Sequence, residues 1–444
     1  MSAKSFFTRL LSISLHWQIL AAMVVGLLTA MLCRDVLSLE SGLFVSGSKS
    51  LGALFLRLLK MVIVPLVMSS IIVGVANVGD PKNLGRMGIK TMGYYMVTSL
   101  FAIMIGLVLT GLIRPGAGVE MGGSEVFDQE SLNTPGSPYE ILMRMIPVNP
   151  IGATVEGDML AIIFFALLLG VAITHLPENH RRSLSPLIDA FFHAMMRMTT
   201  GIIRLAPLGV YGLIFRAWME LPDKSLFQAI GTYMATIALG LTVHLLVVLP
   251  SLFFLMTRRN PIRHFRNMLD AMLTAFSTSS SSATLPVTLE CTEKNAGVEN
   301  RVSSFVLPLG ATINMDGTAL YECAGVLFIA QVLGIDLSLG QQLTVILTAL
   351  LASIGAAGIP SAGLVMIFIV LEAVGIQGEQ VGLIVGTMLA VDRPLDMYRT
   401  VVNIFSDSVA TVIVAHSEDA IQDDDHPGDV VTPVGESQAE QPGT

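Results

Sequence analysis

The chain has 444 residues, of which 53% are hydrophobic and only 13% are charged. Soluble proteins carry about 25% charged residues. This composition and the mean hydropathy of +0.71 exclude an ordinary soluble enzyme, a disordered protein and a nucleic-acid-binding protein. The formal net charge of −9 comes almost entirely from residues 418–444, which contain eight acidic residues and no Lys or Arg. The rest is nearly neutral and apolar, which predicts a membrane protein.

Long apolar stretches divide the first part of the chain, and a spanning helix needs about 20 such residues. The first stretch follows Lys4 and Arg9 but lacks a convincing small-residue cleavage site, so we expect a retained helix rather than a signal peptide. The fifth contains one Asp and three Arg residues, which we expect to reach the interface or pack against protein. Six spanning helices are expected within residues 1–258, over 10–33, 61–79, 91–113, 159–177, 187–219 and 225–257.

Basic residues concentrate in alternate connections between these stretches. The positive-inside rule places the N-terminus in the cytoplasm and returns the chain there near residue 258. Residues 418–444 have no apolar periodicity and predict a disordered acidic cytoplasmic tail. The basic residues are Lys4, Arg9, Lys82, Arg86, Lys90, Arg181, Arg182, Arg258, Arg259, Arg263 and Arg266.

Residues 259–417 contain two uncharged stretches, 271–289 and 337–371, whose centres are rich in Ser, Gly and Pro. Non-helical backbone at membrane depth is tolerated only where protein or a polar cavity satisfies its polar groups. Each stretch therefore predicts a re-entrant hairpin that enters and leaves on one side. Paired interrupted segments indicate inverted repeats around a midplane binding site. A shared spacing agrees with this: Ser279, Ala283 and Pro286 correspond to Ser353, Ala357 and Pro360.

The apolar segment after the first hairpin is interrupted by Asn314 and Asp316. An unpaired carboxylate at that depth costs at least ~2.5–3.5 kcal/mol. Gly310 and Gly317 would permit a break in the helix that frees backbone carbonyls. Carbonyl, amide and carboxylate oxygens together suit a hard cation. The alternative is a polar network that only packs helices together.

The last apolar segment carries five polar residues at spacings of 4, 3, 4 and 4, which places them on one helical face. Arg399 can hold a carboxylate through two hydrogen bonds, and Asp396, almost one turn earlier, suits an ammonium group. An amino acid with an acidic side chain presents both groups. The alternative is an internal Asp396–Arg399 ion pair, which leaves the other members unexplained. The five residues are Asp392, Asp396, Arg399, Asn403 and Asp407.

Other polar side chains receive no role from their pattern alone. Three oxygens at near-helical spacing in the third stretch are typical of helix-packing hydroxyls. The isolated histidines predict interfacial or buried residues, and the three cysteines, which lack metal-ligand spacing, predict small buried side chains. The three oxygens belong to Tyr95, Thr98 and Ser99. The histidines are His16, His175, His193 and His244, and the cysteines are Cys33, Cys291 and Cys323.

The motifs in combination resemble the glutamate transporter family, which holds the excitatory amino acid transporters and the prokaryotic sodium–aspartate and proton–glutamate symporters. The resemblance covers residues 10–416, and several independent motifs occur in the family's order. They are residues 279–286, the run 314–318, residues 355–360 and the segment 396–407.

This resemblance implies an all-α membrane protein with eight transmembrane helices, two re-entrant helical hairpins and inverted repeats. It implies a homotrimer with cytoplasmic termini in a bacterial-type inner membrane. A scaffold, mainly helices one, two, four and five, would make the trimer contacts. Helices three and six with residues 259–417 would form a transport domain that moves like an elevator. The implied function is import of aspartate or glutamate with Na⁺ as coupling ion and no cofactor.

The resemblance also implies three sodium sites. The first matches Tyr95, Thr98, Ser99, Asn314 and Asp316. The second combines carbonyls of Gly310, Asn314 and Asn403 with the Asp407 carboxylate. The third combines Thr312 with carbonyls of Ser353, Ile354 and Ala356, beside Met315.

For the substrate, the resemblance implies that Arg399 binds the side-chain carboxylate and Asp396 the amino group. The remaining substrate-binding residues that it implies are Ser280, Ser281, Thr318, Ile359, Gly363, Thr400 and Asn403.

Several alternatives stay open. Ser279 and Met397 stand where archaeal and animal members, respectively, carry Arg, so potassium counter-transport is undecided in either direction. Proton coupling is the nearest alternative, although Asp407 and the intact run 314–318 favour sodium. A channel or sensor without coupled transport is a further alternative. No Ser–His or metal constellation supports an intramembrane enzyme. The pattern does not distinguish aspartate from glutamate.

Overall fold

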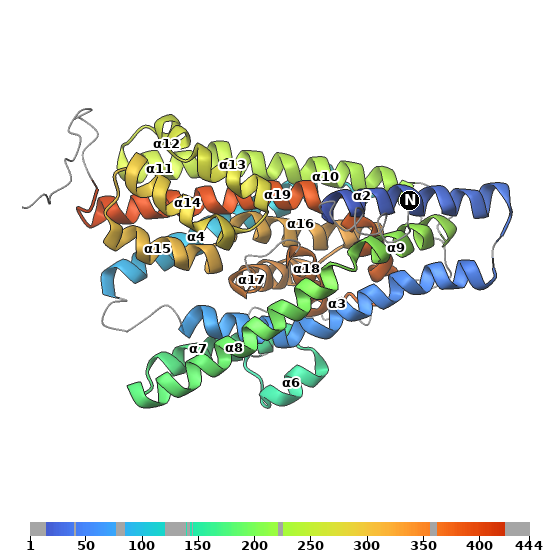
Figure 1. Ribbon diagram of the computed structural model, residues 1–444, viewed down its shortest axis with the longest axis horizontal. Helices are drawn as coiled ribbons and strands as arrows, with labels where there is room; N and C mark the ends of the chain where they lie inside the picture. Colours follow the sequence, from blue (N-terminus) through green and yellow to red (C-terminus); the bar gives the residue numbers. More distant parts are fainter. Residues whose placement is uncertain are drawn as a thin grey trace, which may run out of the picture.

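The structure is a computed structural model. It describes residues 15–39, 41–76, 85–119, 139, 143, 145–220, 225–355 and 362–421. Long helices lie roughly side by side along the longest axis of the molecule (Figure 1). Within the described residues, the regular elements are helical apart from one isolated antiparallel bridge between Val298 and Ile421.

The first part of the chain, up to Thr257, forms a series of helices within the described residues. They are α2 (Leu15–Met31), the π-helical turn η1 (Leu32–Val36), α3 (Leu43–Ala76), α4 (Gly85–Ile113), α6 (Pro150–Glu156), α7 (Met159–Thr174), α8 (Glu178–Ile203), α9 (Ala206–Glu220), α10 (Ser225–Val243), η3 (His244–Val248) and α11 (Leu249–Thr257).

The second part of the chain is built from shorter helices and one very long one. They are α12 (Pro261–Asn267), α13 (Leu269–Thr278), α14 (Ser281–Glu290), the π-helical turn η4 (Cys291–Asn295), α15 (Asn300–Ile313), α16 (Asp316–Val332), α17 (Leu339–Gly355), α18 (Ala362–Ala373) and α19 (Glu379–Ser417).

Five helical stretches of the described chain are long and apolar enough to cross a membrane, and a sixth results if one bent pair forms a single span. They include the expected first, third and sixth helices. The shorter α7 occupies the expected fourth position. The five stretches are Trp17–Val36, Leu43–Ala76, Arg86–Ile113, Ser225–Thr257 and Val391–Ser417.

The second helix is longer than its charge-free window predicts, because α3 begins at Leu43 and not near residue 61. Its basic residues fit within the helix. Lys49 forms an ion pair with Glu220 at 3.0 Å, and the Lys60 ammonium lies 5.2 Å from the centroid of an aromatic ring on α18. A window that excludes charged residues therefore misses the first turns of this helix.

The prediction of one helix over 187–219 is wrong. Helices α8 and α9 meet at an angle of 53° after a break at Arg204 and Leu205. Pro207 occupies the first turn of α9, where its missing N–H does no harm. The same residue inside a continuous helix would remove a backbone hydrogen bond and clash with the preceding turn.

The first interrupted stretch forms two helices, α13 and α14, that pack against each other. Ser279 ends α13 with a left-handed φ of 51°. Ser280 then caps α14, its hydroxyl oxygen accepting a hydrogen bond from the Ala283 N–H at 3.2 Å, which is the usual role of a serine at this position. In the second stretch, α17 and α18 also pack against each other, while residues 356–361 lie outside the described residues.

The centre of the molecule is formed by α16 and α19. The expected break between Gly310 and Gly317 is confirmed, since α15 ends at Ile313 and α16 begins at Asp316. Helix α16 packs against α4, α18 and α19, and α19 packs against α13, α15 and α16. Nearly all of α16 is buried, and the three cysteines are buried and free, as expected.

Residues 418–421 belong to the folded body. The Glu418 carboxylate binds Arg86 at 2.7 Å and Lys90 at 2.6 Å, and the Glu299 N–H donates to the Ala420 carbonyl at 3.0 Å. The expected disordered tail otherwise falls on residues 422–444, outside the described residues.

Candidate functional site

The fully buried carboxylate of Asp316 lies at the start of α16. Its Oδ1 accepts a hydrogen bond from the Ser99 hydroxyl at 2.7 Å, and its Oδ2 accepts one from the Ser406 hydroxyl at 2.6 Å. His244 Nε2 lies 3.1 Å from the same Oδ2. Polar groups from α4, η3 and α19 thus converge on one carboxylate at a helix N-terminus, where the helix dipole favours negative charge.

A second buried carboxylate, Asp407, lies beside the break between α15 and α16. The Asn314 side-chain amide donates to Asp407 Oδ1 at 2.8 Å and to the Ser406 hydroxyl oxygen at 3.0 Å. The Asn314 Oδ1 atom is buried and has no hydrogen-bond partner among the described residues. An orphaned buried acceptor is costly, and a cation beside it would remove that cost. The amide oxygen therefore fits the predicted role of a cation ligand.

Helix α4 supplies three buried hydroxyl groups to this region. The Tyr95 hydroxyl donates to a carbonyl of α15 at 2.9 Å, and the Thr98 hydroxyl donates to carbonyls of its own helix. A side chain at Gly310 would overlap both the Tyr95 hydroxyl and the Asp407 carboxylate. The absence of a Cβ thus lets the α15 backbone approach the two groups, as the first two predicted cation sets require.

Asn403 connects α19 to the first turn of α16. Its Oδ1 accepts a hydrogen bond from the Gly317 N–H at 2.8 Å. Its Nδ2 lies 3.3 Å from the Met315 sulfur and 3.5 Å from the Thr318 hydroxyl. Asn403, predicted for both cation and substrate binding, therefore lies where the two sets of residues meet.

Arg399 is the largest fully buried side chain among the described residues. Its Nη2 donates to Asp396 Oδ1 at 2.7 Å and to Asp392 Oδ1 at 3.2 Å, and its guanidinium carbon lies 3.8 Å from the centroid of the Tyr321 ring. The internal ion pair considered as an alternative is therefore present. However, Nη1 and Nε of Arg399 have no hydrogen-bond partner among the described residues. These two donors can still bind the carboxylate of a ligand.

The remaining predicted substrate residues differ in how closely they lie to Arg399 and Asp396. A Cβ at Gly363 would lie 2.5 Å from Arg399 Nη1, so the start of α18 lies directly against the guanidinium. The Thr400 hydroxyl donates to the Asp396 carbonyl at 2.8 Å, within its own helix. Ser281, at the start of α14, is buried, and α14 packs against α19. Ile359 lies outside the described residues.

The residues of the third predicted cation set contact one another less than those of the first two sets. Thr312 and Ser353 lie on α15 and α17, which pack against each other, and both hydroxyls donate to carbonyls of their own helices. Ile354 is buried on α17, and Ala356 lies outside the described residues. Met315 links this set to the second one, since the Asn403 amide donates to the Met315 sulfur at 3.3 Å.

Three residues at this centre escape the sequence patterns. His244 is buried, as predicted, but nothing in the sequence pattern indicates that its ring contacts Asp316. Ser406 resembles any other helical hydroxyl, although it adjoins Asp407. Glu322 on α16 is fully buried, and neither carboxylate oxygen has a hydrogen-bond partner among the described residues. An acid within an apolar helix is itself a functional signal, and it could have identified Glu322.

The donor set has a clear chemical character. Two carboxylates, amide groups and hydroxyls lie around the break between α15 and α16, while the described residues contain no group of three or more His, Cys, Asp or Glu side chains suited to a metal ion. Carboxylate, amide and hydroxyl oxygens suit a hard cation. Beside them, Arg399 and Asp396 present opposite charges that match an amino acid with an acidic side chain.

Comparison with known proteins agrees with this chemistry. Residues 15–417 match the model of the sodium:dicarboxylate symporter family. The chain belongs to the sodium:dicarboxylate symporter family. As a member of it, the chain is a multi-pass membrane transporter and not an enzyme.

Similar curated proteins are excitatory amino acid transporters. Excitatory amino acid transporter 3 of Homo sapiens is 36% identical and aligns with 90% of this chain and 85% of its own length. Excitatory amino acid transporter 1 of Ambystoma tigrinum is 36% identical, with 82% and 76% covered. An excitatory amino acid transporter of Caenorhabditis elegans is 36% identical, with 89% and 86% covered.

Proposed function

We propose that the protein imports aspartate or glutamate by coupling its movement to the entry of sodium ions. The observation that carries sodium coupling is the unpartnered Oδ1 of Asn314 beside the Asp407 carboxylate. Asn403 lies one turn before Asp407 on α19 and accepts a hydrogen bond from the Gly317 N–H in the first turn of α16. A cation bound by Asn314 and Asp407 would stabilise the first turn of α16 and thereby the residues that hold the substrate.

The proposed substrate follows from Arg399. A buried guanidinium is costly unless its donors are satisfied, and two of its nitrogens lack partners within the described chain. A side-chain carboxylate can accept hydrogen bonds from both of them. The ammonium group of the same substrate would approach Asp396, which would then exchange part of its contact with Arg399 for the ligand.

The architecture that we propose has eight transmembrane helices and two re-entrant hairpins, α13–α14 and α17–α18, related as inverted repeats. The N-terminus and the end of α19 would face the cytoplasm of a cell with a bacterial-type inner membrane. A scaffold, mainly α2, α3, α7, α8 and α9, would form a homotrimer. The remaining helices would move across the membrane as one transport domain.

Purified protein in proteoliposomes tests the function. Labelled aspartate and glutamate are offered while sodium, proton and potassium gradients are imposed one at a time. Sodium alone is expected to drive accumulation of at least one of the two amino acids. Accumulation driven by a proton gradient in the absence of sodium contradicts sodium coupling. Sodium-independent equilibration without accumulation indicates a channel or sensor.

Proton coupling is the second candidate, and two observations favour it. Glu322 is a fully buried carboxyl group without a partner among the described residues, and burial favours its neutral, protonated form. His244 contacts Asp316 inside the same centre. Both groups are suited to carry a proton together with or in place of a cation.

A further inference from the structure

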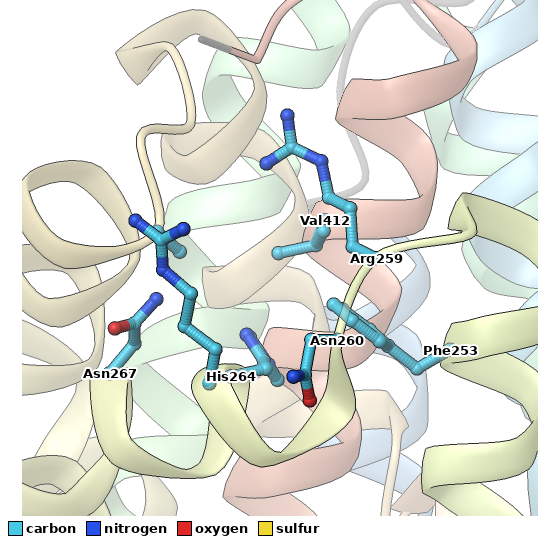
Figure 2. A pocket seen from close by; sticks show the side chains of 8 residues that line it. Phe253, Arg259, Asn260, His264, Asn267 and Val412 are labelled. Atoms are coloured by element: carbon cyan, nitrogen blue, oxygen red, sulfur yellow. The ribbon is translucent and has the colours of Figure 1, made fainter. Parts of the chain in front are cut away.

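A cavity of about 280 Å³ lies where α3, the corner between α6 and α7, and the end of α18 meet. This volume is close to the lower end of the range of about 300–1,000 Å³ that small-molecule pockets occupy. A second concavity, beside α12 (Figure 2), has a volume of only about 10 Å³, which is room for about one water molecule. The larger cavity can therefore hold an organic molecule, whereas the smaller one cannot.

Lys60 brings a positive charge to one wall of this cavity, near the middle of the apolar helix α3. Its ammonium group lies 5.2 Å from the centroid of the Phe368 ring, and it forms no hydrogen bond or ion pair within the described residues. A cation in the middle of a helix of spanning length is costly unless water or an anion satisfies it. The Lys60 side chain is exposed, so an anion that enters the cavity can reach it.

Glu372, at the end of α18, brings a negative charge to the same cavity. The Gln377 side-chain amide donates to Glu372 Oε1 at 3.3 Å, and a Cβ at Gly157 would lie 2.9 Å from the same oxygen. The carboxylate is thus held against the turn between α6 and α7. Glu372 Oε2 accepts no hydrogen bond within the described part of the chain, and Glu156 adds a second carboxylate to the lining. The cavity therefore offers carboxylate oxygens to an ammonium group.

The opposite charges of Lys60 and Glu372 act on each other across the cavity, although no ion pair joins these two described residues. A lone anion bound at Lys60 would face two carboxylates, and a lone cation bound at Glu372 would leave Lys60 unsatisfied. A zwitterion carries both charges and satisfies both walls. The lining also contains apolar side chains, among them Ile63, Phe368 and Ile376, which favour an occupant with an apolar part.

We propose that this cavity binds a small zwitterion with an apolar body, its anionic group at Lys60 and its ammonium group at Glu372. Free amino acids with apolar side chains have this chemistry, and so do phosphatidylethanolamine lipids, whose headgroup carries a phosphate and an ammonium group.

The cavity walls come from both parts of the proposed transporter. Helices α3 and α7 belong to the proposed scaffold, and α18 belongs to the proposed transport domain. An occupant of the cavity therefore holds the two parts against each other and inhibits transport. This inhibition rests on the proposed function, whereas the binding itself does not.

Calorimetry on the purified full-length protein in phosphatidylcholine nanodiscs tests the binding, with L-leucine as the probe. Isocaproate lacks the ammonium group of leucine, and isoamylamine lacks its carboxylate. Leucine is expected to bind saturably, and each analogue at least about tenfold more weakly, because each leaves one wall of the cavity unsatisfied. Absence of leucine binding, or equal affinity of either analogue, overturns the proposal.

Variants of the lining place the bound leucine. Lys60→Gln and Glu372→Gln should each weaken leucine binding at least about tenfold, because each removes one of the two charges. Arg57→Gln should bind leucine normally and is the matched control, since Arg57 is an exposed cation on the same helix that does not line the cavity. The unfolding midpoint without leucine checks that each variant is folded. Wild-type leucine affinity in either folded cavity variant overturns the proposal.

Nanodiscs that also contain phosphatidylethanolamine distinguish the two sources of the zwitterion. A several-fold lower leucine affinity in these nanodiscs identifies the lipid headgroup as the natural occupant, because it competes for the same cavity. An unchanged affinity identifies the free amino acid.

Aspartate uptake by proteoliposomes separates the cavity from the proposed function. Leucine should lower the maximal rate without changing the aspartate concentration for half-maximal uptake, and Lys60→Gln should relieve this inhibition. Competition between leucine and aspartate would place leucine at the substrate site and overturn the proposal. If leucine binding depends on Lys60 but leaves uptake unaffected, the site stands, and the inhibition through the proposed scaffold and transport domain is overturned.

Discussion

At the scale of single residues, the buried carboxylates at the centre of the protein belong to one connected hydrogen-bond network. Asp316 and Asp407 are buried within one network that Ser406 and Asn314 connect. An isolated buried carboxylate would be strongly destabilising, so each acid must be balanced by hydrogen bonds, a cation or a proton. This requirement leads to three predictions.

Replacing Asp407 by Asn removes one full charge from the proposed cation site. We expect the sodium concentration for half-maximal aspartate uptake to rise at least about tenfold, since a unit charge 4 Å away is worth a few kcal/mol at intermediate dielectric. Thr411→Val is the matched control, because the Thr411 hydroxyl donates to the Asp407 backbone carbonyl at 2.7 Å and leaves the carboxylate unchanged. An unchanged sodium dependence of Asp407→Asn would exclude Asp407 as a ligand.

Arg399 and Asp396 should control different parts of the substrate. Arg399→Cys should abolish aspartate and glutamate uptake and permit some transport of serine, alanine or cysteine. Asp396→Ala should impair every amino acid, leaving dicarboxylates such as succinate as the only substrates. Competition assays distinguish these outcomes. Arg393→Cys, which removes a neighbouring arginine 3.4 Å from Asp396, is the control and should retain acidic selectivity. Near wild-type aspartate affinity in Arg399→Cys would overturn the substrate assignment.

Glu322 should determine the response to protons. Glu322→Gln keeps the shape of the neutral acid but cannot release a proton. If a proton is carried together with substrate, aspartate uptake by this variant should no longer respond to an imposed proton gradient, whereas the wild type should. Asp336, an exposed acid in the connection between α16 and α17, provides the control variant Asp336→Asn. A wild-type response in Glu322→Gln would remove Glu322 from the proton pathway.

At the scale of helices, the sequence predicts the interrupted elements better than the continuous ones. The breaks at Ser279 and at Asn314 follow from local chemistry, namely capping hydroxyls and a polar pair between apolar runs, so the pattern identifies them. The bend at Arg204 and the early start of α3 depend on tertiary partners instead. Glu220 accommodates Lys49 within α3, and no window of α3 alone reveals it.

The same distinction applies to the site. Residues on one helical face, such as Asp396, Arg399 and Asn403, share a spacing that the sequence displays. His244 reaches Asp316 from a helix 72 residues away in the chain. Nothing in its own segment predicts that contact, because it arises only when η3 packs beside α16.

The pairing of α3 with α9 depends on the closest backbone approach in the proposed scaffold. A Cβ at Gly212 would meet the backbone of Gly52 and Ser48. We expect Gly212→Ala to destabilise the folded protein by about 1–3 kcal/mol, the usual cost of overpacking. Gly47→Ala, on α3 with open space around its Cα, should be neutral or slightly stabilising. Thermal unfolding in detergent compares them, and equal midpoints would contradict the assigned packing.

At the scale of the whole molecule, Glu418 joins the ends of elements that are far apart in sequence. Its carboxylate accepts hydrogen bonds from Arg86 and Lys90 at the start of α4, and Arg301 on α15 donates to its backbone carbonyl. Hydrogen bonds from Arg86 and then Lys90 lower the pKa of Glu418 to about 2. The ion pairs therefore persist at pH values where an ordinary glutamate is already protonated.

This lowered pKa predicts how stability depends on pH. The contribution of Glu418 should be complete above pH ~5, decrease as the pH falls below the ordinary value of about 4.3, and vanish near the folded-state pKa. The difference in unfolding midpoint between wild type and Glu418→Gln should follow that course. Asp419→Asn, at the adjacent exposed position, is the control. A difference that stays constant down to pH 2 would contradict the assignment.

The single helix α19 runs from the proposed substrate face to this junction without interruption. Arg399 and Ser417 are 18 residues apart on it, which corresponds to about 27 Å of helix. A stiff rod of that length carries any rotation or shift of its inner part to its outer end. A fluorophore attached at the exposed residue His416 would therefore report ligand binding optically, from a position far from the residues proposed to bind the ligand.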